Sequence, residues 1–242
     1  MKIEIHPAAE RGAGDFGWLH AKYSFSFANY YNPKRTGFGN LLVLNEDMID
    51  PGEGFEEHSH DNMEIVTIIL DGVLEHKDSN GNIALIKKGD VQRMSAGNGV
   101  SHSEYNHSDK EKVHLLQIWI HPDVTGIAPE YEQKSFNLNE RNKLVNIVSS
   151  EKINDSLGIH QDARLYYGSF EKNKKIQYKL KDSRYGAFLF LINGKLDIAG
   201  NVINSGDAAA ITDASQIEII ARDKSEFLIV DVLLVVRRGM HK

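Results

Sequence analysis

The sequence contains no cysteine, so disulfide bonds and thiolate metal sites are excluded, and a reducing cytoplasm is compatible with the chain. There is also no excess of positive charge, because the formal net charge of −6 gives no attraction to nucleic acid or to an anionic membrane. No uninterrupted apolar run approaches the length of a membrane-spanning helix, and the first residues, MKIEIHPAAERG, are too polar for a signal peptide. We therefore expect a cytoplasmic protein without a nucleic-acid or membrane partner.

The composition is that of a globular protein, with 41% hydrophobic and 26% charged residues. A chain of 242 residues suits one large domain or two small ones, and it can bury a sizeable core. Short apolar runs separated by turn residues follow one another along it. EIVTIIL at 64–70 is β-branched and suits a buried strand, Asp71 and Gly72 mark a hairpin turn, and VHLLQIWI at 113–120 alternates. This pattern predicts an all-β barrel or sandwich.

Three segments test this interpretation. Tyr23, Phe25 and Phe27 alternate with serines, which predicts a strand with one aromatic face. Residues 123–140 are polar and irregular, and we predict a linker there. Residues 138–150 (LNERNKLVNIVSS) fit either a short helix or a strand.

The two halves of the chain share an order of strands and glycine turns. Residues 68–96 and residues 189–214 both give an apolar strand, Gly, a short strand, a Gly turn, a strand, Gly-Asp and a strand. Such an internal repeat predicts two copies of one domain, which we place at 1–130 and 131–242. The second copy has no histidine in the loop after Gly206 and Asp207, so we expect metal only in the first.

Two pairs of potential metal ligands stand at the ends of the first copy. His58 and His60 are one residue apart, and so are His102 and Glu104. Side chains at i and i+2 of a strand point to the same face, so each pair can aim both groups at one point. Three imidazoles and a carboxylate suit a first-row divalent metal and leave coordination positions open. Glu64 shares the parity of His58 and His60, so parity alone does not choose between the two glutamates.

These residues resemble the two motifs of the cupins. Gly52, His58, His60 and Glu64 fit the first motif, although Gly72 comes one residue late. Gly89, Gly97, His102 and Asn106 fit the second, with Ser95 in place of the usual proline and a loop two residues longer between Gly97 and His102. The longer loop, together with SFSFANYYNP, HKDSNG and GDVQRMSAG, is similar to the pirin family of two-cupin proteins. Arg93, where animal pirins carry an aromatic residue, points to the bacterial branch.

The resemblance implies two cupin barrels of the double-stranded β-helix (jelly-roll) type in one chain, the second degenerate. It also implies a ligand set of His58, His60, His102 and Glu104, with Glu64 left to orient a ligand histidine. Iron(II) is the metal that the family leads us to expect, while manganese, cobalt, nickel, copper and zinc also suit these donors. With two barrels in one chain, we expect a monomer.

For function, the resemblance implies a quercetin 2,3-dioxygenase, which opens the heterocycle of a flavonol with O2 and releases carbon monoxide, with Glu104 as the catalytic base. The alternative is a metal-binding regulatory or interaction protein of the pirin type with incidental oxygenase activity. A third reading is a cupin that uses the fold only for packing and holds no stoichiometric metal.

Other residues have a structural and a functional interpretation. Phe25, Phe27 and Phe55 fit either the core or an apolar substrate pocket. His76, His107, His114 and His121 are expected to be solvated or hydrogen-bonded, with His76 also a candidate to support a ligand. Lys34 and Arg35 are expected to be solvated charges, and Gly97 and Gly99 to occupy turns with unusual backbone angles.

Overall fold

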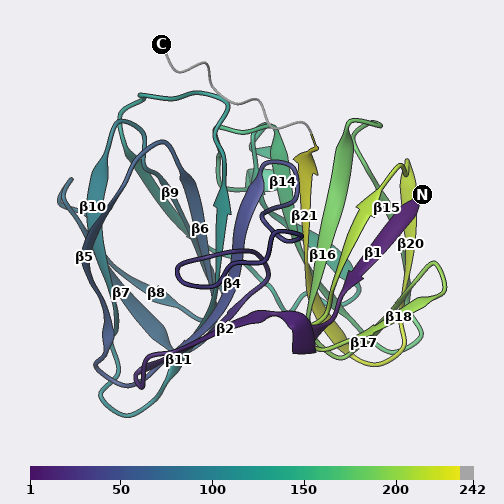
Figure 1. The fold of residues 1–242 in the computed structure, drawn as a ribbon, viewed down its shortest axis with the longest axis horizontal. Coiled ribbons are helices and arrows are strands. Elements are labelled where there is room, and N and C mark those ends of the chain that lie inside the picture. Colours follow the sequence, from purple (N-terminus) through teal and green to yellow (C-terminus); the bar gives the residue numbers. More distant parts are fainter. Residues whose placement is uncertain (235–242) are drawn as a thin grey trace.

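The computed structural model describes residues 1–234 of the chain. The apolar run EFLIVDVLLV at 226–235 predicts a strand, and its last residue lies outside the described range. The two cupin barrels lie side by side (Figure 1). Each barrel is built from one large and one four-stranded antiparallel sheet. Regular structure other than strands is limited, within residues 1–234, to two single turns of 3₁₀ helix, η1 (Ala8–Glu10) and η2 (Ile153–Asp155).

The first barrel holds the predicted ligands. Its large sheet has the order β12-β9-β6-β11-β4-β3-β2, and its small sheet has the order β5-β10-β7-β8. The bounds of these strands are β2 (Gly12–Asp15), β3 (Leu19–Tyr23), β4 (Leu41–Ile49), β5 (Gly54–His60), β6 (Glu64–Asp71), β7 (Val73–Asp78), β8 (Ile83–Lys87), β9 (Asp90–Ser95), β10 (Val100–Asn106), β11 (Val113–Ile120) and β12 (Glu130–Ser135).

The second barrel has the same plan with an apolar interior. Its sheets have the orders β1-β19-β16-β21-β14-β13 and β15-β20-β17-β18. The bounds are β1 (Lys2–His6), β13 (Lys143–Ser149), β14 (Ala163–Phe170), β15 (Lys175–Lys179), β16 (Tyr185–Asn193), β17 (Lys195–Ile198), β18 (Asn201–Asn204), β19 (Ala208–Thr212), β20 (Gln216–Ala221) and β21 (Ser225–Leu233).

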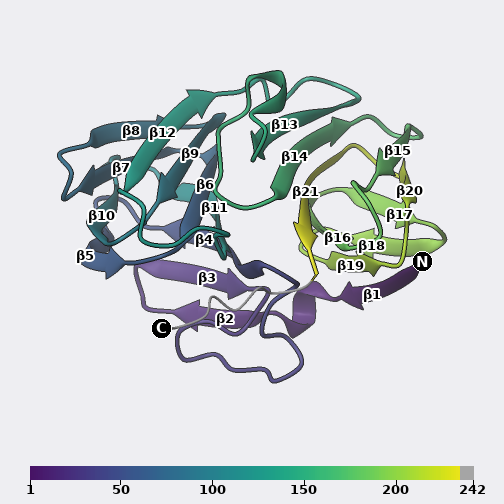
Figure 2. The same ribbon diagram turned by 90° about the horizontal axis from the view of Figure 1, so that it is seen from above.

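Strand pairing crosses the division that we place between residues 130 and 131. β1 pairs with β19, so the N-terminal strand lies on the second barrel, as both views show (Figures 1 and 2). In the other direction, β12 pairs with β9 of the first barrel along its whole length. The division at 130 stays a proposal. The second barrel is completed by β1, which precedes the division, and the first barrel by β12, which follows it in all but its first residue.

The strand predicted across Tyr23, Phe25 and Phe27 is wrong beyond its first residue. β3 ends at Tyr23, and the chain then bends, because the Ser26 hydroxyl bonds to the carbonyl oxygens of Asn32 and Arg35 and holds a loop. The bend sends Phe25 into the core between the barrels.

The linker predicted at 123–140 is also wrong, because β12 forms inside it. EYEQKS lacks apolar alternation, but its backbone completes the edge of β9. The ambiguous segment at 138–150 contains a strand, β13, and not a helix.

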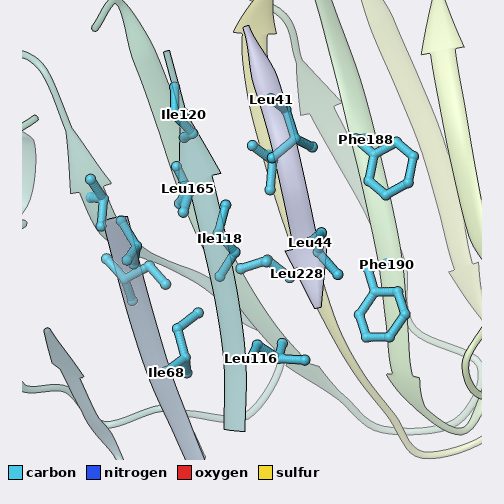
Figure 3. Close-up of a cluster of buried hydrophobic side chains, with 14 of the residues drawn as sticks. Leu41, Leu44, Ile68, Leu116, Ile118, Ile120, Leu165, Phe188, Phe190 and Leu228 are labelled. Atoms are coloured by element: carbon cyan, nitrogen blue, oxygen red, sulfur yellow. The ribbon is translucent and has the colours of Figure 1, made fainter. Parts of the chain in front are cut away.

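An apolar core joins the barrels. Leu41, Leu44 and Leu116 from the first barrel pack against Phe188 and Leu228 from the second (Figure 3). These side chains are fully buried, so the two barrels share one continuous core. No helix of residues 1–234 has the length and apolarity needed to cross a bilayer.

Candidate metal centre

Neighbouring strands of the small sheet bring the two predicted ligand pairs together. β5 and β10 run antiparallel, with His58 opposite His102 and Val100 opposite His60. A bulge between His102 and Glu104 shifts the register, so that Glu104 lies opposite Phe55. Bulges re-aim side chains and are common beside active sites.

The three histidines converge on one point. The ligand atoms of His58, His60 and His102 all lie within 4.8 Å of one another. A second group with the same spacing contains Glu104 and His76, joined to the first group through His102. Within residues 1–234, such groups of three occur only in the first barrel.

Glu104 is buried and held by one of its two oxygens. Gln117 on β11 donates from Nε2 to Glu104 Oε2 at 2.9 Å, and Gln117 Oε1 accepts a hydrogen bond from Trp119 Nε1 at 3.1 Å. Glu104 Oε1 is buried and has no hydrogen-bond partner in the described part of the chain. The carboxylate is therefore fixed in orientation with one oxygen free.

The donor atoms fit a divalent metal ion. His102 Nε2 is also buried without a partner, and a buried polar atom without a partner is unfavourable unless something binds it. His58 Nδ1 lies 2.8 Å from the carbonyl oxygen of Glu56, so it donates there and leaves Nε2 for a ligand. A metal at this point would satisfy the two buried atoms that have no partner, His102 Nε2 and Glu104 Oε1.

The electrostatics favour neutral imidazoles. Burial, followed by the neighbouring His102 and His58, lowers the pKa of His60 to about 4. Burial, followed by His58 and His76, lowers the pKa of His102 to about 3. Histidine binds a metal through the lone pair of its neutral ring, so both rings are ready to bind at neutral pH.

Glu64 lies outside both ligand groups. The chain turns at Asn62, which has a φ of 45°, so Glu64 begins β6 in the other sheet and does not continue the strand of His58 and His60. Its Oε2 accepts a hydrogen bond from the Ser95 hydroxyl at 2.8 Å, and burial raises its pKa. The turn explains why parity along the sequence does not separate the two glutamates.

A cavity of about 220 Å³ opens onto His58, His60 and Glu104. Its walls are mainly apolar and aromatic, and they include Phe27, Phe55 and Trp119. Phe27 and Phe55 thus line the pocket, whereas Phe25 is core. The aromatic alternation of the sequence therefore contains residues of both kinds.

Sequence reasoning missed the polar wall of this cavity. Asn45, Asp47 and Gln117 line it from β4 and β11, and the Oδ1 atoms of Asn45 and Asp47 are buried without partners. Burial, with a contribution from the charge of Glu104, raises the pKa of Asp47 to about 7. Asn45 and Asp47 have the same parity and interrupt the apolar run LLVLNEDMI. Two polar residues on one face of an apolar strand are the sequence feature that could have predicted this polar wall.

Other assignments differ in outcome. Arg35 is not a solvated charge, because it is buried and its guanidinium donates to Glu10 Oε2 at 2.6 Å, whereas Lys34 is exposed. Gly97 and Gly99 have φ values of 52° and 131°, which confirms their turn role. His107 and His114 pair with Glu75 and Glu46, as expected of hydrogen-bonded histidines.

Comparisons with known proteins agree with this architecture. Residues 6–120 match the family Pirin, and residues 146–232 match the Quercetinase C-terminal cupin domain. The quercetin 2,3-dioxygenase of Escherichia coli K12 is 41% identical over 230 residues, which cover 95% of this chain and 98% of that protein. A pirin-like protein of Caulobacter vibrioides is 38% identical over 231 residues, covering 95% of this chain and 99% of that protein.

A solved structure shows the same fold over nearly the whole chain. The crystal structure of the bacterial pirin YhhW from Escherichia coli in complex with nickel(II) matches with a TM-score of 0.93 at 39% identity. The match covers 97% of this chain and 100% of that chain. With its two cupin barrels and its cluster of potential metal ligands in the first, this chain belongs to the pirin family.

Proposed function

We propose that this protein is a metal-dependent dioxygenase that opens the heterocycle of flavonols such as quercetin with O2 and releases carbon monoxide. The observation that carries the proposal is the cluster of His58, His60 and His102 beside Glu104, at the base of an aromatic cavity. The relatives named quercetin 2,3-dioxygenase support an oxygenase, and the finer choice of substrate is our proposal.

His58, His60, His102 and Glu104 would hold the metal. When bound, a divalent metal supplies a Lewis acid that lowers the pKa of a phenolic hydroxyl and open positions for substrate and O2. Iron(II) is our first choice. The nickel(II) complex of the Escherichia coli pirin shows that a different divalent metal binds that relative.

Glu104 would accept the proton of the flavonol hydroxyl on Oε1, the same oxygen that would contact the metal, because a monodentate carboxylate can leave or share coordination. Gln117 keeps the other oxygen occupied, so the base needs little reorganisation before proton transfer. Asp47 lies in the same cavity, and its raised pKa keeps part of its population protonated near neutral pH. We propose that it can donate a hydrogen bond to the substrate.

The cavity suits a flat aromatic molecule with hydroxyl groups. Phe27, Phe55 and Trp119 offer apolar faces that exclude water, and Asn45 and Asp47 offer partnerless polar atoms to hydroxyls. A purely apolar ligand would leave these two atoms unpaired. A polyphenol would satisfy them.

The test measures the oxygen-dependent loss of quercetin together with the release of carbon monoxide. Protein stripped with a chelator is reconstituted with iron(II), then with manganese, cobalt, nickel, copper and zinc, beside His102→Ala. We expect metal-dependent turnover that the variant lacks. Absence of turnover with every metal, in protein shown to hold one metal ion per chain, would overturn the proposal in favour of a regulatory or binding protein.

A further inference from the structure

His76 lies next to the proposed ligands without belonging to either predicted pair. Its strand, β7, borders β10 on the side away from β5, with His76 opposite Glu104 and Asp78 opposite His102. The His76 side chain is fully buried. It also packs against Tyr131 of β12, with ring centroids 4.9 Å apart and a tilt of 33° between the rings, which restricts rotation of the imidazole.

A chain of contacts runs from His102 through His76 to a carboxylate. His102 Nδ1 lies 3.4 Å from His76 Nδ1, and His76 Nε2 lies 3.3 Å from Asp78 Oδ2. Asp78 itself is 1% exposed. These contacts involve one nitrogen of His102 and both nitrogens of His76. Which ring nitrogens carry a proton therefore decides which of them donate and which accept.

The Asp78 end fixes those protons. Its Oδ1 accepts backbone N–H groups of Asn80 and Asn82 at 3.0 Å, and its Oδ2 accepts Asn82 Nδ2 at 2.8 Å. A carboxylate that receives three donors acts as an acceptor, so the proton between Asp78 and His76 belongs to His76 Nε2. In a neutral imidazole Nδ1 is then an acceptor, and its one lone pair is shared by two donors at 3.4 Å, the amide of Gln92 and His102 Nδ1.

The protons of His102 follow from this arrangement. If His76 Nδ1 accepts, His102 Nδ1 carries a hydrogen and donates it. The lone pair of His102 then lies on Nε2, the buried atom that has no partner within residues 1–234. Metal-bound histidines characteristically donate their other nitrogen in this way, which sets the tautomer and the ring orientation.

We propose that His76 is a positioning residue, which with Asp78 holds His102 in the tautomer and orientation that direct Nε2 at the metal. The inference rests on the proposed metal site but not on the proposed reaction. It also distinguishes two roles for His76, because the spacing of His76, His102 and Glu104 would equally allow His76 to be a ligand.

The first test needs no variant. In protein with ¹⁵N-labelled histidine, long-range ¹H–¹⁵N correlation spectra report which nitrogen of each ring is protonated. We expect His76 to be protonated on Nε2 and His102 on Nδ1, both in metal-free and in zinc(II)-loaded protein, with zinc shifting His102 Nε2. A proton on His76 Nδ1, or zinc bound by His76, would overturn the proposal. Neither result depends on quercetin turnover.

The second test measures cobalt(II) binding by its visible absorption and by calorimetry. His76→Leu removes the acceptor, and we expect affinity to fall by roughly 10- to 100-fold while one ion still binds per chain with an unchanged spectrum. His76→Asn places an oxygen near the position of Nδ1 and should restore most of the affinity. His107→Leu, which removes a histidine bonded only to Glu75 at the surface, should leave binding unchanged.

Two outcomes of this series would contradict the positioning role. Unaltered affinity in His76→Leu would show that the chain of contacts does not influence His102. Loss of stoichiometric cobalt in both His76 variants, with the same spectral change as in a His102→Ala variant measured in parallel, would show that His76 is itself a ligand.

Discussion

Single residues of the metal centre follow from parity wherever the chain stays in one strand. His58 with His60, and His102 with Glu104, each share a face, and the structure groups the three histidines and places Glu104 beside His102. Parity carries no information across the turn at Asn62, so it could not separate Glu64 from the proposed ligands. Hydrogen bonds from other strands, such as that from Gln117 to Glu104, leave no periodic trace in the sequence and could not be predicted.

The two phenylalanines of SFSF provide a residue-scale prediction, because one is core and the other lines the cavity. Phe25→Ala removes a side chain that is 1% exposed, so we expect the free energy of unfolding to fall by about 3–5 kcal/mol with little change in the KM for quercetin. Phe27→Ala removes a wall of the cavity, so we expect a smaller loss of stability and a KM about tenfold higher. Denaturant unfolding and steady-state kinetics test the pair, and the reverse assignment of effects would contradict it.

The lowered pKa of His102 predicts how metal-free protein responds to acid. At pH 7 the ring is neutral in both states, but below about 6.5 the unfolded chain binds a proton that the folded protein excludes until about pH 3. The free energy of unfolding should therefore fall as the pH drops, by about 2 kcal/mol from this residue between pH 7 and pH 5.

Denaturant titrations of metal-free wild type and His102→Asn at several pH values measure the contribution of His102 to the pH dependence of the free energy of unfolding. The other titrating side chains are shared, so the difference between the two profiles reports the contribution of His102, including its effect on the pKa of His60. We expect the variant to lose less stability between pH 7 and pH 5. Parallel profiles would show that the pKa of His102 is not lowered in the folded protein.

At the scale of strands, apolar alternation in the sequence predicts most of the strands of the structure. It does not predict β12, whose sequence has no such alternation. β12 has a polar sequence, and it forms because its backbone pairs with β9 while Tyr131 packs on His76. At Tyr23, Phe25 and Phe27 the alternation predicted a strand that does not continue past Tyr23. There, hydrogen bonds of the Ser26 hydroxyl hold a loop in place of strand pairing. Both differences depend on partners distant in sequence, which a local pattern does not contain.

The pairing of β5 with β10 depends on a close approach that predicts the effect of one substitution. A Cβ at Gly54 would lie 2.3 Å from the carbonyl oxygen of Glu104 and 2.5 Å from Cα of Tyr105. Gly54→Ala should force the strands apart, lowering the free energy of unfolding by about 1–3 kcal/mol and weakening metal binding, because the ligands lie on both strands.

Gly52→Ala is the matched control for this strand pair. A Cβ at Gly52 would meet no atom within 4 Å among the described residues beyond its two chain neighbours, although the φ of 71° adds backbone strain. We expect a loss of stability there without a loss of metal affinity. Calorimetric metal titration of both variants compares them, and equal affinities would contradict the steric argument.

For the whole molecule, the repeat in the sequence predicted two barrels but not the exchange of strands between them. β1 completes the second barrel and β12 completes the first, and a shared apolar core lies between (Figure 3). Each barrel thus covers a face of the other, and we propose on this ground that the protein is a monomer.

The shared core predicts that the two barrels unfold together. Both tryptophans of the chain, Trp18 and Trp119, lie in the first barrel, so their fluorescence reports its unfolding. Phe188→Ala in the second barrel should nevertheless lower the tryptophan-detected free energy of unfolding by about 3–5 kcal/mol. Val202→Ala, at a side chain that is 49% exposed, should change it little. An unchanged tryptophan transition in Phe188→Ala would mean that the barrels unfold independently.

The central claim is that the first barrel performs metal-dependent chemistry with Glu104 and not with the glutamate of the cupin motif, Glu64. The most direct measurement is quercetin turnover by Glu104→Gln and Glu64→Gln, each compared with wild type at matched metal content. We expect Glu104→Gln to keep its fold and much of its metal while turnover falls by about 100-fold or more, since it loses its base. Glu64→Gln, whose carboxyl is occupied by Ser95, should remain active. Retained turnover in Glu104→Gln, or its collapse only in Glu64→Gln, would contradict the account.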